Sequence, residues 1–125
     1  MENIIIEGSN KTPHIAFDSV SGILELSGKS IPENSFAFYQ PLLVWLDNYI
    51  VQPAATTVVK VQLEYFNTSS SKCLLDIFRK LEILRTSQKS TVKVAWYYEE
   101  EDEDMQEAGQ DYDSLVDVPF EIIQL

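Results

Sequence analysis

The chain has 125 residues, 45% of them hydrophobic, which is enough to form the core of one domain. Cys73 is the only cysteine, which excludes an internal disulfide or a cysteine-built metal site and favours a reducing, cytoplasmic compartment. No window contains the roughly 20 apolar residues that a membrane-spanning helix needs, and the first residues lack the pattern of a secretory signal. We therefore expect one cytoplasmic domain over residues 1–125, with no membrane contact.

The net charge of −11 is concentrated in one segment. Ten of the 20 acidic residues and no Lys or Arg lie between Glu99 and Asp117, so the rest of the chain, with ten acids against nine bases, is close to neutral. Binding to nucleic acid requires a concentrated basic surface, which this sequence does not contain. The charge pattern therefore argues against nucleic acids and anionic membranes as partners.

The first 30 residues predict strands and turns. A short edge strand is expected at Asn3–Glu7. Two apolar runs, His14–Asp18 and Ile23–Ser27, are separated by a segment in which Gly22 provides the backbone freedom of a turn. We expect these two runs to form a hairpin.

The pattern then changes to that of a helix. Apolar residues recur every three or four positions over Ser35–Val51, which predicts an amphipathic helix. Asn34 is a plausible cap, Pro41 starts or kinks the main part of the helix, and Pro53 ends it.

The middle of the chain predicts a strand, a hydroxyl-rich turn, a helix and a second strand. Apolar and polar residues alternate over Thr57–Phe66, and the turn Asn67–Ser71 follows directly. A second amphipathic helix starts near Leu74 and ends near Arg85, and alternation returns over Val92–Tyr98. This order predicts a crossover that pairs the two strands in parallel.

A third helix over Asp102–Tyr112 and a last strand over Phe120–Gln124 complete the predicted elements. Together they indicate an α/β sandwich, in which about three helices pack on one mixed sheet of five to six strands.

Catalytic machinery is sparse in this sequence. His14 is the only histidine, and it stands between Pro13 and Ile15 at the start of a predicted strand, without a nucleophile motif elsewhere. The four glycines are scattered and form no phosphate-binding loop. We expect a protein that is not an enzyme and that uses no cofactor.

The acidic run Glu99–Asp104 allows three interpretations. It lacks the ligand spacing of a calcium loop, so a metal site is the weakest of them. The run can be a solvated start of the third helix, where the helix dipole favours acids, or it can steer a basic partner. A small enzyme or a ligand- or metal-binding domain that uses this run with Tyr97 and Tyr98, which we expect to be exposed, is therefore the alternative function.

The cluster Thr68–Ser71 is the other chemical feature of the sequence. Hydroxyl residues are common helix caps, and capping alone explains the cluster. A phosphate added here would lie at the positive end of a helix, where backbone N–H groups accept it without unfolding the domain. Capping and regulation by phosphorylation are therefore compatible.

Five segments of uncommon sequence occur along the chain. They are Thr12-Pro13-x-Ile15-x-Phe17-Asp18, Gly28-Lys29-Ser30-Ile31-Pro32-Glu33-Asn34, Phe38-Tyr39-x-Pro41-Leu42-x-x-Trp45-Leu46, Leu63-Glu64-Tyr65-Phe66-Asn67-Thr68-Ser69-Ser70-Ser71-Lys72 and Trp96-Tyr97-Tyr98-x-Glu100.

In this order the segments resemble the SiaC family of bacterial regulatory phosphoproteins, from about residue 7 to residue 123. The resemblance implies a partner-switching module that is similar in fold and logic to the STAS domains of anti-sigma-factor antagonists. In that family the threonine after Tyr-Phe-Asn is the phosphoacceptor, which corresponds to Thr68 here.

The resemblance also implies the partners. A SiaB-type kinase would phosphorylate Thr68, and a SiaA-type phosphatase of the PP2C class would reverse this. The unphosphorylated form would bind and activate a SiaD-type diguanylate cyclase, which links the protein to cyclic-di-GMP and to biofilm or aggregation control.

We expect the partner surface to surround Thr68. Beyond the acceptor, we assign to it the neighbours Asn67, Ser69 and Ser70 and, from the polar segment before the first helix, Lys29, Ser30 and Glu33. That second segment can also be a structural corner with Asn34 as its cap.

Overall fold

Six strands and three helices occur in the predicted order in the computed structural model, which describes residues 1–125. The elements are β1 (Ile4–Ile6), β2 (His14–Phe17), β3 (Ile23–Ser30), α1 (Ser35–Val51), β4 (Thr56–Phe66), α2 (Thr68–Ser87), β5 (Thr91–Tyr98), α3 (Glu103–Leu115) and β6 (Phe120–Gln124).

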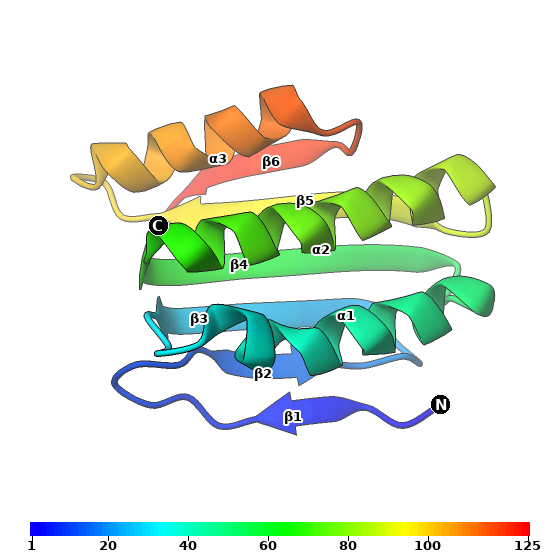
Figure 1. Cartoon of the computed structure of the whole chain (residues 1–125). Coiled ribbons are helices and arrows are strands. Elements are labelled where there is room, and N and C mark those ends of the chain that lie inside the picture. Colours follow the sequence, from blue (N-terminus) through cyan, green and yellow to red (C-terminus); the bar gives the residue numbers. More distant parts are fainter.

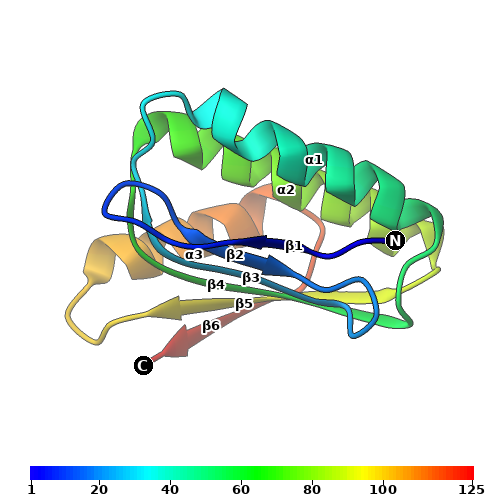
Figure 2. The ribbon, with the colours of Figure 1, turned by 90° about the horizontal axis from the view of Figure 1, so that it is seen from below.

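All six strands form one mixed sheet in the order β1-β2-β3-β4-β5-β6 (Figure 1). β1, β2 and β3 are antiparallel neighbours, whereas β3, β4, β5 and β6 run parallel. Each parallel pair is joined through one helix, and the three helices cover the same face of the sheet (Figure 2). The predicted α/β sandwich and the parallel pairing of β4 with β5 are confirmed.

This topology gathers the helix starts. The chain leaves the carboxyl ends of β3, β4 and β5 and enters α1, α2 and α3, so the three helix amino termini lie along one edge of the molecule (Figure 1). Segments that are far apart in the sequence meet at this edge. We call it the carboxyl edge of the sheet.

The hairpin between β2 and β3 forms as predicted, with Gly22 at a φ of 75°. A Cβ atom at this position would collide with the carbonyl oxygen of Thr56. The turn therefore needs glycine both for its backbone conformation and for the close passage of the start of β4.

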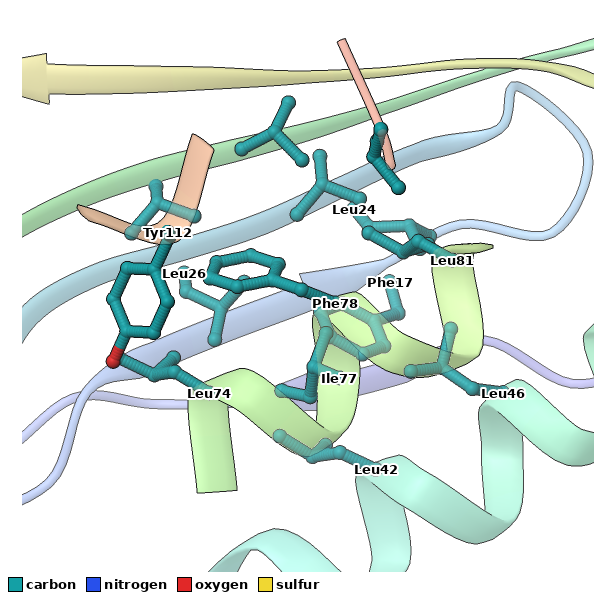
Figure 3. Packing of buried hydrophobic residues seen from close by; sticks show 14 of the residues in the cluster. Phe17, Leu24, Leu26, Leu42, Leu46, Leu74, Ile77, Phe78, Leu81 and Tyr112 are labelled. Atoms are coloured by element: carbon teal, nitrogen blue, oxygen red, sulfur yellow. The ribbon is translucent and has the colours of Figure 1, made fainter. Parts of the chain in front are cut away.

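The hydrophobic core lies between the sheet and the helices, and Figure 3 shows how its side chains interdigitate. Alternate residues of the strands and one face of each of the two long helices supply most of it. The core side chains labelled in this view include Phe17, Leu24 and Leu26 from the sheet, Leu42 and Leu46 from α1, and Leu74, Ile77, Phe78 and Leu81 from α2. None of the helices is both long and apolar enough to cross a membrane.

Two predicted boundaries are wrong. β3 continues to Ser30 instead of ending at Ser27, so Lys29 and Ser30 are strand residues and not part of a loop. α2 begins at Thr68 and ends at Ser87, so the hydroxyl cluster is the first turn of the helix and not a turn before it. Both differences lie at the carboxyl edge.

A β-bulge at the end of β4 changes which side chains face the helices at the carboxyl edge. Gly28 is opposite Leu63 and Lys29 is opposite Tyr65, which leaves Glu64 without a partner on β3. The extra residue inverts the alternation, so Phe66 faces the helices and packs against Trp96 with a centroid distance of 6.1 Å. Because of the bulge, Phe66 lies on the helix side of the sheet at the point where the chain leaves β4 and enters α2.

α3 is held close to the sheet by Trp96. The Nε1–H of Trp96 donates to the carbonyl oxygen of Met105 at 2.9 Å, and a Cβ at Gly109 would lie 2.5 Å from Trp96 Cδ1. One turn later the hydroxyl of Tyr112 donates to the carbonyl oxygen of Ser71 at 2.7 Å. α3 therefore packs against both β5 and the first turns of α2.

Replacing Gly109 with Ala should destabilise the protein by about 1–3 kcal/mol, because α3 must move away from the buried Trp96 ring. Urea unfolding followed by tryptophan fluorescence measures this change. The matched control is Gln110→Ala, an exposed position on the same helix, which should change stability by less than about 0.5 kcal/mol. Equal stabilities of the two variants would contradict the close approach of α3 to Trp96.

Candidate functional site

The candidate site is the start of α2 at the carboxyl edge. Asn67 caps the helix, because its side-chain oxygen accepts the backbone N–H of Ser70 at 2.9 Å. The backbone N–H of Asn67 donates to the carbonyl oxygen of Ser30 at 3.0 Å, which ties the end of β4 to the end of β3. Thr68 is therefore the first helical residue and not the cap.

Three of the four hydroxyls in the cluster have a hydrogen-bond partner within the protein. Ser69 Oγ lies 2.7 Å from Ser35 Oγ and donates to Asn67 Oδ1 at 3.2 Å. Ser70 Oγ is fully buried and donates to the Ser30 carbonyl oxygen at 3.1 Å. Ser71 Oγ donates to the carbonyl oxygen of Thr68 at 2.6 Å.

Thr68 differs from these neighbours. Its side chain is exposed, and only its backbone carbonyl takes part in a hydrogen bond with the other hydroxyls of the cluster. The hydroxyl that projects from the first turn without a protein partner is therefore the one at position 68.

A buried hydroxyl network lies beneath this turn. Ser30 Oγ donates to Ser70 Oγ at 2.8 Å, so its oxygen is free to accept the hydroxyl hydrogen of Tyr39 at 2.6 Å. No buried side-chain polar atom in the protein lacks a partner. The network joins β3, α1 and α2 without the cost of an unsatisfied polar group.

The environment of Tyr39 shifts its ionisation. Burial raises the pKa of Tyr39 from 10.0 to about 12, and its hydrogen bond with Ser30 opposes this only in part. Burial also raises the pKa of Tyr112, whose hydroxyl contacts the first turn of α2. Both phenols are therefore neutral hydrogen-bond donors at physiological pH.

The electrostatics of the α2 amino terminus favour an anion. No acidic residue lies in the first turn of α2, whereas the first turn of α3 contains Glu103 and Asp104. The positive end of the α2 dipole is thus left without a compensating carboxylate. Lys72, which is exposed one turn after Thr68, adds a positive charge on the same side of the helix.

The structure separates the residues that the sequence assigns to a partner surface. Lys29 and Glu33 are exposed, whereas Ser30 and Ser70 are fully buried and cannot contact a partner directly. The segment from Lys29 to Asn34 does lie next to the start of α2. The Ser30 carbonyl accepts a hydrogen bond from the Asn67 backbone, and Ser35, the residue after this segment, contacts Ser69. Ser30 and Ser70 instead hold the first turn of α2 in place through their buried hydrogen bonds.

Sequence reasoning missed four residues of this site. Ser35 and Tyr39 of α1 belong to the hydroxyl network, and their helical periodicity gives no signal for this role. Phe36 and Tyr65 are large aromatic residues that are 68% and 58% exposed. An aromatic residue at a polar position of a helix or strand is the signal that could have found them.

The acidic segment Glu99–Asp104 connects β5 to α3 at the same edge, and Asp102 caps α3 by accepting the Met105 N–H at 3.0 Å. Tyr97 and Tyr98 are half-buried and not exposed as expected. They line, with Glu99, a cleft of about 170 Å³, and no group of three acidic, histidine or cysteine side chains is placed to hold a metal ion. Small-molecule sites are usually about 300–1,000 Å³, so this cleft is small for a ligand.

The model of one protein family matches residues 6–125, which include the site and every element described above except the start of β1. Its description is SiaC family regulatory phosphoprotein. The chain belongs to the SiaC family. The resemblance carried by the five sequence segments is therefore confirmed.

Relatives of this SiaC-family chain share its full length. An uncharacterized protein of Pseudomonas aeruginosa strain UCBPP-PA14 is 29% identical over 122 residues, which are 98% of this chain and 96% of the relative. The structure of Pseudomonas aeruginosa SiaC is 26% identical, with a TM-score of 0.90 over 100% of both chains.

A further structure shows the diguanylate cyclase SiaD in complex with its activator SiaC from Pseudomonas aeruginosa. The matching chain is 28% identical to this one, with a TM-score of 0.91 over 98% of this chain and 99% of that chain. This protein therefore has the same fold as the matching chain of that complex.

Replacing Tyr39 with Phe should cost about 1 kcal/mol at about pH 8, because Ser30 loses the hydrogen bond that it accepts. The cost should shrink as pH rises. The folded protein holds the Tyr39 proton up to about pH 12, whereas the unfolded chain releases it near 10.0, so wild-type stability from this group is fully present below pH 10.0 and is lost progressively as pH rises to about 12.

Urea unfolding of wild type and Tyr39→Phe at about pH 8 and about pH 11 measures this effect. Tyr112, whose pKa is also raised, is present in both proteins, so its ionisation does not contribute to the difference between them. Tyr65→Phe is the control at about pH 8, where loss of an exposed hydroxyl should change stability by less than about 0.5 kcal/mol. A difference between wild type and Tyr39→Phe that grows with pH would contradict the buried network.

Proposed function

We propose that this chain is a non-enzymatic switch protein that is controlled by phosphorylation of Thr68. Its unphosphorylated form binds and activates a SiaD-type diguanylate cyclase. A SiaB-type kinase adds the phosphate, and a SiaA-type phosphatase of the PP2C class removes it. The cyclase part of the proposal is supported by the complex of SiaD with its activator SiaC, whose fold this chain shares.

The observation that carries the proposal is the state of the four hydroxyls at the start of α2. Ser69, Ser70 and Ser71 each have a hydrogen-bond partner within the protein, and Thr68 alone presents an exposed hydroxyl without one. A kinase must reach the oxygen from outside and remove its proton, so Thr68 is the best acceptor of the four.

The fold can take up the modification without rearranging. A phosphate at the first helical position lies at the positive end of α2, where no carboxylate competes with it. The anchors of this turn, Asn67 and the buried Ser70, remain in place because they do not use the Thr68 side chain. Phosphorylation therefore changes the surface and leaves the fold unchanged.

Exposed aromatic side chains support a binding surface at this edge. Phe36 follows Ser35, whose hydroxyl contacts Ser69, and Tyr65 lies three residues before Thr68. Aromatic residues are frequent anchors of protein interfaces, where a neighbouring phosphate would have to be desolvated. We therefore place the cyclase-binding surface around Thr68 and Phe36, with Lys29 and Glu33 at its rim.

Replacing Thr68 with Ala should abolish phosphorylation and change the free energy of unfolding by less than about 0.5 kcal/mol, because Asn67 and not Thr68 caps the helix. The protein is incubated with a SiaB-type kinase and ATP, and the peptide Val61–Lys72 is analysed by mass spectrometry. Ser71→Ala is the matched control and should be modified at the wild-type rate. Full modification of the Thr68 variant would refute the assignment.

Phosphorylation should weaken binding to the cyclase by at least about a hundredfold, because two charges would be buried in an interface that does not pair them. The loss should persist at about 0.5 M NaCl, where charges are screened beyond about 5 Å. Calorimetry of both forms with a SiaD-type cyclase at low and high salt measures it. Full recovery of affinity at high salt would instead indicate a long-range effect added to the net charge of −11.

A further inference from the structure

Thr68 and Ser69 present a kinase with two exposed hydroxyls on adjacent residues of the first turn of α2. Proximity alone cannot direct phosphate to one of them with high fidelity. The difference between the two residues is their hydrogen bonding. The Ser69 hydroxyl is hydrogen-bonded to Ser35 on α1 and to Asn67, the cap of the same turn, whereas the Thr68 hydroxyl has no partner in the protein.

The hydroxyl protons around Ser69 can be assigned by counting donors and acceptors. Asn67 Oδ1 only accepts, and it lies 3.2 Å from Ser69 Oγ and 3.5 Å from Ser35 Oγ, so the shorter distance assigns the Ser69 proton to Asn67. The contact of 2.7 Å between Ser35 and Ser69 is then a hydrogen bond that Ser35 donates. The Ser69 oxygen therefore gives its proton to Asn67 and offers a lone pair to Ser35.

This arrangement opposes phosphoryl transfer to Ser69. In the transfer, a lone pair of the acceptor oxygen forms the bond to the γ-phosphorus of ATP, the bond to the β,γ-bridging oxygen breaks, ADP leaves, and the hydroxyl proton passes to a base of the kinase. On Ser69 one lone pair is engaged by Ser35, and the proton points to Asn67, which is not a base. The proton must leave Asn67 before a base of the kinase can take it, and the hydrogen bond from Ser35 draws electron density from the Ser69 oxygen and holds it against α1, which makes it a poorer nucleophile than Thr68.

Ser35 is well placed to keep this hold. It is the first residue of α1, directly after the cap Asn34, and only 3% of its surface is exposed. Its hydroxyl also lies 3.2 Å from Ser70 Oγ, within the buried network. A group on α1, more than 30 residues from the acceptor in sequence, thus controls a hydroxyl next to Thr68.

We propose that Ser35 is a specificity-determining residue, which confines phosphorylation to Thr68 by engaging the hydroxyl of Ser69. Ser35 is a positioning residue and does not touch the phosphate donor. The proposal rests on Thr68 as the acceptor of the switch. It predicts that loss of the Ser35 hydroxyl makes Ser69 a second acceptor.

The test compares Thr68→Ala with the double variant Thr68→Ala, Ser35→Ala. Each protein is incubated with the same SiaB-type kinase and ATP, and fragmentation of the peptide Val61–Lys72 locates the phosphate. We expect no phosphate on Ser69 in the single variant and at least about tenfold more in the double variant, as loss of one hydrogen bond allows. Ser35→Cys, which has a similar volume and a weak donor, should act as Ala does.

Two controls separate this proposal from the proposed function. Thr68→Ser must be phosphorylated at residue 68, which shows that the kinase accepts serine. Wild-type protein without phosphate on Thr68 would refute the proposed function itself. With both controls positive, equal phosphate on Ser69 in the single and double variants, or none in either, would overturn the role of Ser35.

Discussion

The hydrogen-bonded pair of buried hydroxyls, Ser30 and Ser70, is the constraint on which the site depends. A buried polar group must be paired, and these two pair with each other across β3 and α2, with Tyr39 of α1 completing the set. Because the pairing fixes the first turn of α2 in rotation, it decides which side chains of the cluster face inward. Thr68 is left outside as a consequence of where Ser70 must be.

A switch built on such a turn separates two tasks. Asn67, Ser70 and the network beneath them hold the helix start, and the exposed position beside them remains available for chemistry. The acidic segment before α3 lies on the same edge but has its own cap in Asp102. In the proposed function, phosphorylation of Thr68 therefore changes the charge of the site while the groups that support the helix start are unaffected.

The fold was largely predictable because local rules and packing agree. Alternation in β4 and periodicity in α1 give the elements, and the crossover gives the parallel pairing. The end of β3 and the start of α2 were misplaced, since the bulge at Glu64 and the hydroxyl pairs depend on tertiary contacts that no local pattern reveals. For the same reason a motif singles out Thr68 as the proposed acceptor, whereas no motif predicts the burial of Ser30 and Ser70 or the contact of Ser35 with Ser69.

The bulge at Glu64 also constrains how relatives of this chain can diverge. It shifts the strand by one residue, so the spacing from Leu63 to Asn67 sets whether Phe66 is inside the molecule and where the helix begins. Insertions and deletions are tolerated in surface loops, but one residue more or less in this short stretch would turn every following side chain to the opposite face. In an alignment of the family, this stretch should therefore be free of gaps even where its residue types vary.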